Sequence, residues 1–361
     1  MESLLSGYQL GATTLNNRVV MAPMTRSRAV DGVPDHNTAL YYAQRASAGL
    51  IISEGVPISR QGRGYLYTPG IYSQRQVEAW RTVTDAVHEQ GGRIFAQLWH
   101  VGRVSHRSIQ PENGAPVSSV AVAGGKAFAY DELGEARDLA ASQPQALDET
   151  GIETLVDEFR QAAANAIEAG FDGVEIHAAN GYLIEQFINP VLNTREDPYG
   201  GATLESRSRF LLDVVDAVVE EIGAESTGVR LSPYNELGDM PLYTDIAETY
   251  LHITDALNAR KIAYLHLAAQ QQLIASGLLE ELRKSWKGTL ILAGGLSAAQ
   301  ADRMIADGLL DLAAFGTPFV ANPDFVERTR NSWPLAPVNR SSFYGGGAEG
   351  YVDYPAYHQA G

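Results

Sequence analysis

The sequence predicts an α/β protein in which a single (β/α)8 TIM barrel occupies residues 1–361. Amphipathic helices, glycine stops and short apolar strands alternate along the chain, which implies parallel strands joined by right-handed crossovers. Eight strand candidates favour a closed barrel over an open doubly wound sheet. An open sheet normally carries a glycine-rich turn after its first strand, whereas the first candidate here ends in Met21-Ala-Pro-Met-Thr25.

Three helices can be given ends from their residues. Residues 73–90 place apolar side chains at helical spacing, and Ser73 with Gln76 reads as a capping box. Thr150 and Glu153 repeat that spacing at the start of a second helix, and residues 204–222 form a third. The eight predicted strands are residues 19–24, 50–54, 94–98, 174–177, 229–232, 263–267, 290–294 and 312–316.

Two long segments, residues 55–72 and 99–149, each follow a predicted strand. In a barrel such segments lie over the C-terminal mouth, where substrate sites form. Residues 101–149 are too many for a structureless connection, so we expect an inserted cap or hairpin after the third strand.

The composition excludes several classes of function. A net charge of −16 argues against nucleic acid and anionic membranes as partners. The absence of cysteine excludes disulfides, iron–sulfur clusters and thiol nucleophiles. No apolar run approaches the ~20 residues of a membrane span, and the N-terminus lacks a secretory signal pattern. We therefore expect a cytoplasmic enzyme or binding protein, either monomeric or homodimeric.

The densest group of polar residues follows the fourth predicted strand. His177 and Asn180 lie three positions apart, and two such donors suit one carbonyl or nitro oxygen better than a metal. The phenol of Tyr182 is an acid able to protonate a carbanion-like centre. The alternative is that His177 and Asn180 only cap the following turn, and this segment alone leaves both interpretations open.

Other strand ends favour a bound cofactor. Thr25, Gln97 and Arg230 would present a hydroxyl, an amide and a guanidinium to one cavity, which suits a flat heteroaromatic such as flavin. Each alone is better explained by a buried structural hydrogen bond. The ends of the seventh and eighth strands are typical places for a phosphate to meet backbone N–H groups, and they carry Gly294, Gly295, Gly316 and Thr317.

Residues 345–350 (GGGAEG) match the G-x-G-x-x-G pattern of dinucleotide-binding folds. No strand is predicted before them and the printed sequence ends soon after, so the strand–turn–helix context of that motif is missing. We therefore reject a dinucleotide site here. Aromatic residues expected near the mouth are Tyr65, Tyr67, Trp99, Phe343 and Tyr344.

Several longer segments resemble the old yellow enzyme family of FMN-dependent ene-reductases. The resemblance extends from about Leu15 to Pro355, and its segments are specific when taken together. They are residues 21–26 (MAPMTR), 97–103 (QLWHVGR), 170–182 (GFDGVEIHAANGY), 197–201 (DPYGG), 230–233 (RLSP), 321–324 (ANPD) and 343–355 (FYGGGAEGYVDYP).

This resemblance implies a barrel that binds FMN non-covalently, accepts hydride from NADPH or NADH, and reduces activated alkenes. The expected substrates are α,β-unsaturated carbonyls, maleimides and nitroalkenes. It implies that His177 and Asn180 hold the substrate oxygen and that Tyr182 supplies a proton, with Tyr65 and Tyr344 as substrate walls. It implies no metal. The FMN contacts it implies, besides the phosphate-binding residues above, are Pro23, Met24, Thr25, Gly55, Gln97 and Arg230.

Two details refine the resemblance. Thr25 and the lack of cysteine resemble the subgroup that includes bacterial nitrate-ester and N-ethylmaleimide reductases. Thr317 stands where many members place an arginine or lysine on the FMN phosphate, so we expect FMN to be retained with weaker affinity.

Two alternative functions remain at this point. The first is a flavin-free barrel aldolase or isomerase, which usually needs a lysine or a metal-ligand cluster at the strand ends. Neither stands out in this sequence. The second is a flavin-binding module without alkene turnover.

Overall fold

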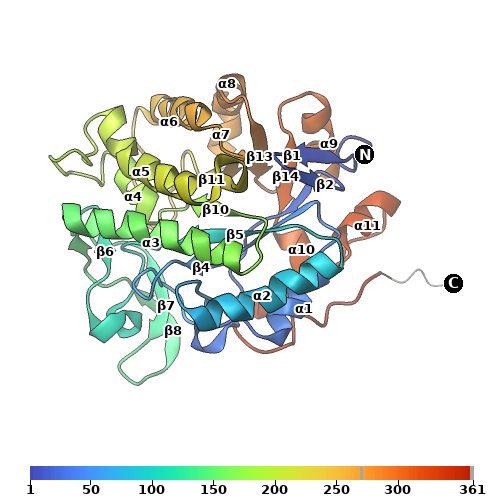
Figure 1. Ribbon diagram of the computed structural model, residues 1–361, viewed down its shortest axis with the longest axis horizontal. Coiled ribbons are helices and arrows are strands. Elements are labelled where there is room, and N and C mark those ends of the chain that lie inside the picture. Colours follow the sequence, from blue (N-terminus) through green and yellow to red (C-terminus); the bar gives the residue numbers. More distant parts are fainter. Residues whose placement is uncertain (269–270, 358–361) are drawn as a thin grey trace.

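A closed barrel of eight parallel strands forms the centre of the computed structural model, which describes residues 1–268 and 271–357 (Figure 1). Neighbouring strands follow chain order around the barrel, and the last strand, β14, closes it against the first, β3. The predicted fold class is therefore confirmed. The barrel strands are β3 (Val19–Met21), β4 (Leu50–Pro57), β5 (Ile94–Trp99), β10 (Gly173–His177), β11 (Thr227–Leu231), β12 (Tyr264–Ala268), β13 (Thr289–Ala293) and β14 (Leu312–Phe315).

The strands are buried almost throughout, as expected when helices cover the outside of a parallel sheet. The first strand ends at Met21 and not at residue 24, so the segment that begins at Ala22 is free to turn across the mouth. The second continues three residues further than predicted, to Pro57, past a register shift between Ile52 and Gly55. That irregularity re-aims the strand end, as β-bulges do.

Helices surround the barrel, and α2, α3, α5 and α6 are seen on its outer side in Figure 1. No helix of the described residues is long and apolar enough to cross a membrane. The helices are α1 (His36–Ala43), α2 (Gln74–Glu89), α3 (Glu149–Glu168), α4 (Leu183–Ile188), α5 (Leu204–Ile222), α6 (Ile246–Arg260), α7 (Gln271–Ala275), α8 (Leu278–Ser285), α9 (Ala298–Ala306), α10 (Thr317–Ala321) and α11 (Phe325–Asn331).

The helix starts test the predicted capping boxes. Ser73 caps α2 and its Oγ accepts from the N–H of Gln76, as predicted. The prediction for α3 is wrong, because Asp148 is its N-cap and accepts from the N–H of Gly151 at 2.8 Å. Aspartate caps at least as well as threonine, and the earlier start also places the Glu149 carboxylate in the first turn.

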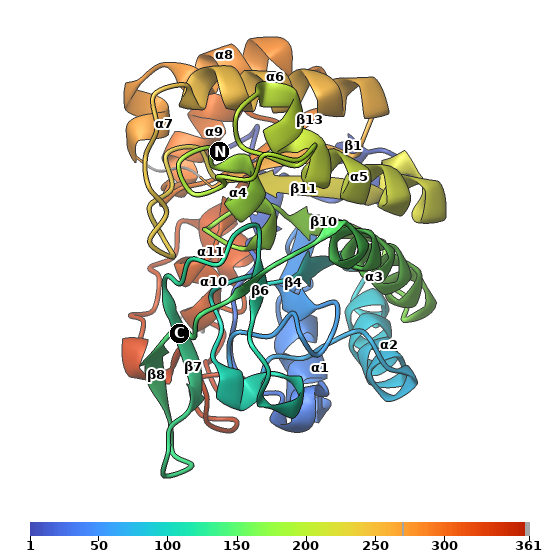
Figure 2. The same ribbon diagram turned by 90° about the vertical axis from the view of Figure 1, so that its left-hand side faces the viewer.

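The expected insertion after the third barrel strand is an antiparallel hairpin of β7 (Lys126–Tyr130) and β8 (Ala136–Ala140). Two short strands, β6 (Val117–Ser118) and β9 (Gln145–Ala146), pair at its base. Figure 2 shows the hairpin extending from the barrel on the side where the C-terminal segment lies. The insertion therefore adds a wall beyond the barrel mouth.

An N-terminal hairpin of β1 (Tyr8–Leu10) and β2 (Thr13–Leu15) was not predicted. Leu10 and Leu15 pack into the apolar cluster inside the barrel, and the Tyr8 hydroxyl bonds Thr289 Oγ1 at 2.8 Å. Because Thr289 begins β13, this hairpin closes the end of the barrel opposite the mouth.

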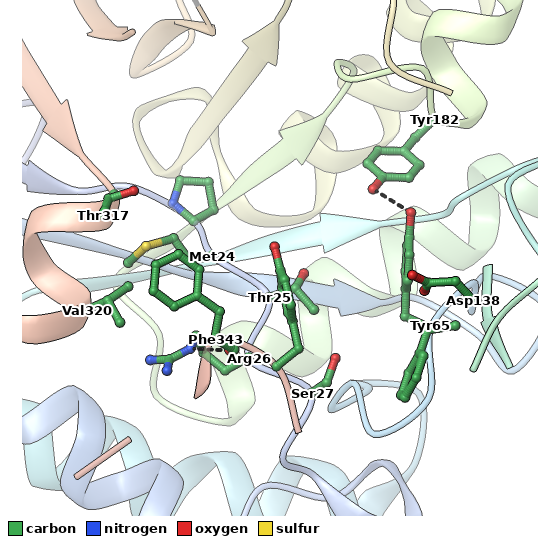
Figure 3. Close-up of a pocket in the computed structure, with 14 residues that line it drawn as sticks. Met24, Thr25, Arg26, Ser27, Tyr65, Asp138, Tyr182, Thr317, Val320 and Phe343 are labelled. Atoms are coloured by element: carbon green, nitrogen blue, oxygen red, sulfur yellow. Dashed lines mark hydrogen bonds between the residues drawn. The ribbon is translucent and has the colours of Figure 1, made fainter. Parts of the chain in front are cut away.

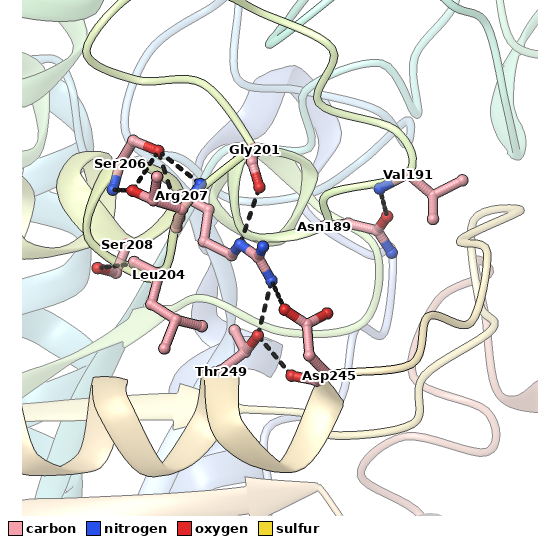
Figure 4. A network of polar contacts seen from close by, with 10 residues as sticks. Asn189, Val191, Gly201, Leu204, Ser206, Arg207, Ser208, Asp245 and Thr249 are labelled. Carbon is pink, nitrogen blue, oxygen red and sulfur yellow. Dashed lines mark hydrogen bonds and ion pairs between the residues drawn. The ribbon is translucent and has the colours of Figure 1, made fainter.

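Residues 197–201 (DPYGG) have a structural role (Figure 4). Arg207 of α5 is buried, and its Nε donates to the carbonyl of Gly201 at 2.9 Å. Its Nη1 bonds Asp245 at 2.8 Å and Thr249 at 2.9 Å, at the start of α6. One guanidinium therefore fixes the turn before α5 to the next helix.

Candidate active site

A cavity of about 650 Å³ opens at the C-terminal mouth of the barrel (Figure 3). This volume is within the range of small-molecule and cofactor sites. The cavity is bounded by the segment after β3, the β7–β8 hairpin, the start of α10 and the C-terminal segment. Among the residues predicted for the site or its mouth, those that line it are Pro23, Met24, Thr25, Tyr65, Tyr182, Gly316, Thr317, Phe343 and Tyr344.

His177 ends β10 and lies beside the cavity, with its ring edge-on to Tyr182 at 5.1 Å between centroids. Its Nδ1 accepts a hydrogen bond from the N–H of Ala179 at 3.3 Å. Burial and the nearby Arg230 hold the pKa of His177 well below its ordinary value, so the ring is neutral. A neutral ring that accepts at Nδ1 carries its proton on Nε2, which is then a hydrogen-bond donor.

Tyr182 is the N-cap residue immediately before α4, and its hydroxyl is 3.2 Å from that of Tyr65 (Figure 3). Burial raises the pKa of Tyr182 well above its ordinary value, so the phenol stays protonated. Its ring meets Trp99 edge-on at 5.0 Å, while Tyr65 stacks on Trp99 at 5.5 Å. A Cβ on Gly55 would lie 2.4 Å from the Trp99 ring, so the glycine is needed for this packing.

Asn180 has a left-handed backbone, with φ of 58°, a conformation that asparagine tolerates better than most residues. Its N–H donates to Ser232 Oγ at 2.7 Å, and the N–H of Gly181 donates to Glu185. Burial raises the pKa of Glu185 to about 7. The side-chain amide of Asn180 makes no hydrogen bond within the described residues, so this tightly held loop leaves it free for a ligand.

Arg230 and Gln97 test whether a flavin fits this barrel. The Arg230 guanidinium is buried, its Nε has no hydrogen-bond partner among the residues that the structure describes, and burial lowers its pKa. An unpaired buried guanidinium is costly unless a ligand completes it. Gln97 is on β5, and β10 lies between this strand and β11, which carries Arg230. The Nε2 of Gln97 donates to Glu175 at 2.8 Å. Buried donors of this kind beside a cavity of cofactor size fit the polar edge of FMN.

Comparison with known proteins identifies the family. Residues 3–335 match the NADH:flavin oxidoreductase / NADH oxidase family, whose members bind FMN. The chain belongs to this family. It is 44% identical to 12-oxophytodienoate reductase 1 of rice (Oryza sativa subsp. japonica), over 98% of this chain and 92% of the rice protein.

Solved structures agree with this assignment to the old yellow enzyme family. Morphinone reductase in complex with tetrahydroNAD superposes with a TM-score of 0.95 and 44% identity, over 99% of this chain and 98% of that one. An old yellow enzyme homologue from Zymomonas mobilis gives a TM-score of 0.92 and 40% identity, over 99% of this chain and 100% of that one. The predicted family, fold, cofactor and oxidoreductase class are therefore confirmed.

Only two of the four residues predicted to contact the FMN phosphate line the cavity. Gly316 and Thr317 line the cavity, whereas Gly294 and Gly295 follow β13 outside its lining. Arg26 is the one basic residue among those lining the cavity, and its guanidinium bonds the carbonyls of residues 342, 343 and 350. Its Nη1 is buried and has no hydrogen-bond partner, so among the described lining residues only this nitrogen of Arg26 is a cationic donor left without an acceptor.

Five lining residues were not predicted for the site: Arg26, Ser27, Phe128, Asp138 and Val320. Phe128 and Asp138 are directly paired across the β7–β8 hairpin, which brings both to the cavity. The buried Ala127 and Ala129 indicate that Phe128 faces the other side of its strand. The register that pairs it with Asp138 has no signal in the sequence.

Residues 342–350, here named the C-terminal strap, include the rejected G-x-G-x-x-G match. No strand precedes the strap among the described residues after α11, in agreement with that rejection. Arg28 donates to the carbonyls of Ser342 at 2.8 Å and Gly347 at 3.0 Å. The strap thereby brings Phe343 and Tyr344 to the cavity. The described residues contain no group of three or more His, Asp or Glu side chains able to hold a metal.

Proposed function

We propose that this protein is an ene-reductase that takes hydride from NADPH or NADH and reduces the C=C bond of α,β-unsaturated carbonyls, maleimides or nitroalkenes. When bound, FMN supplies the hydride chemistry that links the two substrates. The observation that carries the proposal is the pair of neutral donors, His177 and Tyr182, that meet beside the cavity. The similarity to a 12-oxophytodienoate reductase and to morphinone reductase, which reduce C=C bonds of unsaturated compounds, supports the substrate class.

Each polar residue has a defined task in this proposal. The Nε2–H of His177 and the free amide of Asn180 donate to the substrate oxygen, which stabilises charge that develops there during reduction. Thr25, Gln97 and Arg230 hold the ring system of FMN, with backbone groups of Pro23, Met24 and Gly55. Its phosphate would meet the backbone of Gly316 and Thr317, which line the cavity, and of Gly294 and Gly295 at the end of the neighbouring strand β13. Tyr65 and Tyr344 form substrate walls.

Tyr182 delivers the proton to the α-carbon. Its phenol must be protonated before each turnover, and its raised pKa ensures this at neutral pH. The hydrogen bond to Tyr65 fixes the orientation of the hydroxyl.

The direct test is an anaerobic absorbance experiment on the purified holoprotein. Addition of NADPH or NADH should bleach the visible flavin band, and 2-cyclohexenone, N-ethylmaleimide or a nitroalkene should then restore it. Recovery with none of the three alkenes would leave a flavin-binding module without alkene turnover. A chain that binds no FMN would contradict the proposed cofactor contacts.

Replacement of Tyr182 by phenylalanine tests the proton donor. We expect unchanged flavin reduction and a loss of enone turnover of about 10²-fold or more, the range of general acid catalysis. Nitroalkenes should be affected less, because their product anion is stable enough to take its proton from water. Tyr67→Phe is the matched control and should keep its enone turnover, since it removes a phenol that bonds Tyr130 and not Tyr182. Equal enone turnover in Tyr182→Phe and the unaltered protein would assign the proton to another source.

A further inference from the structure

Four neighbouring strands place a buried polar layer directly beside the residues proposed to hold FMN. Glu175 of β10 pairs in register with Gln97 of β5, and Arg230 of β11 pairs with His266 of β12. Glu175 and His266 are both fully buried. Neither has a role in the proposed reaction, although a buried carboxylate is costly unless it is fully bonded.

Both oxygens of Glu175 are committed to hydrogen bonds. Its Oε1 accepts from Gln97 Nε2 at 2.8 Å, and its Oε2 accepts from His266 Nδ1 at 2.8 Å. Burial alone raises the pKa of Glu175, but the hydrogen bonds from His266 and Gln97 and the positive charge of Arg230 hold it below its ordinary value. Burial lowers the pKa of His266, which is therefore neutral and donates from Nδ1. The layer thus holds one negative charge, on Glu175, and one positive charge, on Arg230.

This arrangement has two consequences for a ligand at the strand ends. Because Glu175 takes an N–H of Gln97, only the carbonyl oxygen and the second N–H of that amide remain for a ligand. The carboxylate is also the negative charge that faces the unpaired guanidinium of Arg230, so it offsets part of the positive field there.

We propose that Glu175 is a positioning residue that orients Gln97 toward FMN and lowers the reduction potential of the bound flavin by offsetting the charge of Arg230. The inference rests on the proposed function, which places Gln97 and Arg230 against FMN. His266 anchors the second oxygen of the carboxylate and so fixes its direction.

Glu175→Gln tests this inference in the FMN-loaded protein. The variant keeps the shape and an acceptor for Gln97 but removes the negative charge. In this variant the equilibrium constant for reduction of the bound flavin should rise about tenfold, which equals a rise in reduction potential of about 30 mV for a two-electron couple. A role in packing alone would leave the potential where it is. Glu175→Leu removes the acceptor and so releases the Gln97 amide, and in this variant the FMN dissociation constant, measured by flavin fluorescence, should rise.

Glu185→Gln is the matched control, because Glu185 is an equally buried carboxylate that lies outside this layer and bonds Ser232 and Tyr250. The reduction potential of FMN bound to Glu185→Gln should equal that of FMN bound to the unaltered protein. An unchanged or lowered potential in a FMN-loaded Glu175→Gln variant would overturn the inference. If that variant does not fold, Glu175→Leu combined with His266→Phe removes the carboxylate and its partner together and must shift the potential in the same direction.

The two proposals fail in different ways. The potential is a property of bound FMN and can be measured whether or not an alkene is reduced. A protein that shows the potential shift but does not reoxidise with alkenes would contradict the proposed function alone. A protein that reduces alkenes while Glu175→Gln keeps its potential would contradict the inference alone.

Discussion

At the scale of single residues, burial acts in opposite directions on two neighbouring groups and has one result. It lowers the pKa of His177 and raises that of Tyr182, so both stay uncharged at neutral pH. Arg230 lowers both pKa values, but for Tyr182 burial is the larger effect. The pair therefore offers two neutral donors beside a cationic side chain, an arrangement suited to a substrate whose oxygen gains negative charge.

A prediction at the scale of single residues concerns Thr317 and the affinity for FMN. Thr317 is exposed at the cavity and carries no charge, so the FMN phosphate would lack a charge-assisted bond from this position. Thr317→Arg should tighten FMN binding by about 10–100-fold, the worth of one hydrogen bond to a charged group. The measurement is fluorescence titration of FMN-free protein. Thr317→Val is the control and should bind FMN as the unaltered protein does, while unchanged affinity in Thr317→Arg would place the phosphate elsewhere.

The sequence predicts the site residues at strand ends better than those on the insertion. Thr25, Tyr182 and Gly316 line the cavity as expected, because the mouth of a barrel gathers the ends of its strands. Phe128 and Asp138 were not predicted, since their meeting depends on the register of a hairpin. That register is set by contacts between segments and not by local composition.

At the scale of elements, those with local sequence signals are likewise predicted better than those that depend on contacts between distant segments. Glycine stops and apolar runs predict the barrel strands to within a few residues, because both signals are local. The β1–β2 hairpin has strands of only three residues with mixed polarity, and Leu10 and Leu15 are buried only because the barrel end is there to receive them. Asp148 and Thr150 are both suitable N-cap residues near the start of α3, and in the structure Asp148 is the N-cap.

The C-terminal strap depends on Arg28, which gives the prediction for this scale. Arg28 bonds four carbonyls of residues 342, 343, 347 and 349, so its removal frees the strap that carries Tyr344. In Arg28→Ala we expect faster amide hydrogen exchange over residues 342–350. The KM for the alkene should rise about fivefold, since one hydrogen bond is worth about 1 kcal/mol.

Arg28→Lys serves as the control for this prediction, because it keeps the charge but not the fork of donors and should have an intermediate effect. Faster exchange of the strap with an unchanged KM would show that Tyr344 does not act as a substrate wall.

At the scale of the whole molecule, buried titratable groups make opposing contributions to stability. Burial raises the pKa of Glu54 and of Glu185 to about 7, and it lowers the pKa values of His100, His177 and His266. The carboxyl groups make stability fall as the pH rises, and the histidines make it rise over part of the same range. The total slope therefore identifies no single group, whereas the difference between two variants does.

Glu185→Gln isolates one of these contributions. The carboxyl pKa is about 7 in the folded protein and 4.5 in the unfolded reference, so its stabilising effect is complete below pH 4.5 and is lost as the pH rises through 7. The free energy of unfolding of the unaltered protein, minus that of Glu185→Gln, should fall by up to about 3 kcal/mol between pH 4.5 and pH 8. Urea unfolding at several pH values measures it. Glu132→Gln, on the exposed hairpin turn, is the control and should give no such fall. If the difference for Glu185→Gln is constant or grows with pH, the carboxyl is ionised in its bonds to Gly181 and Ser232, and the loop of Asn180 is held by a charge.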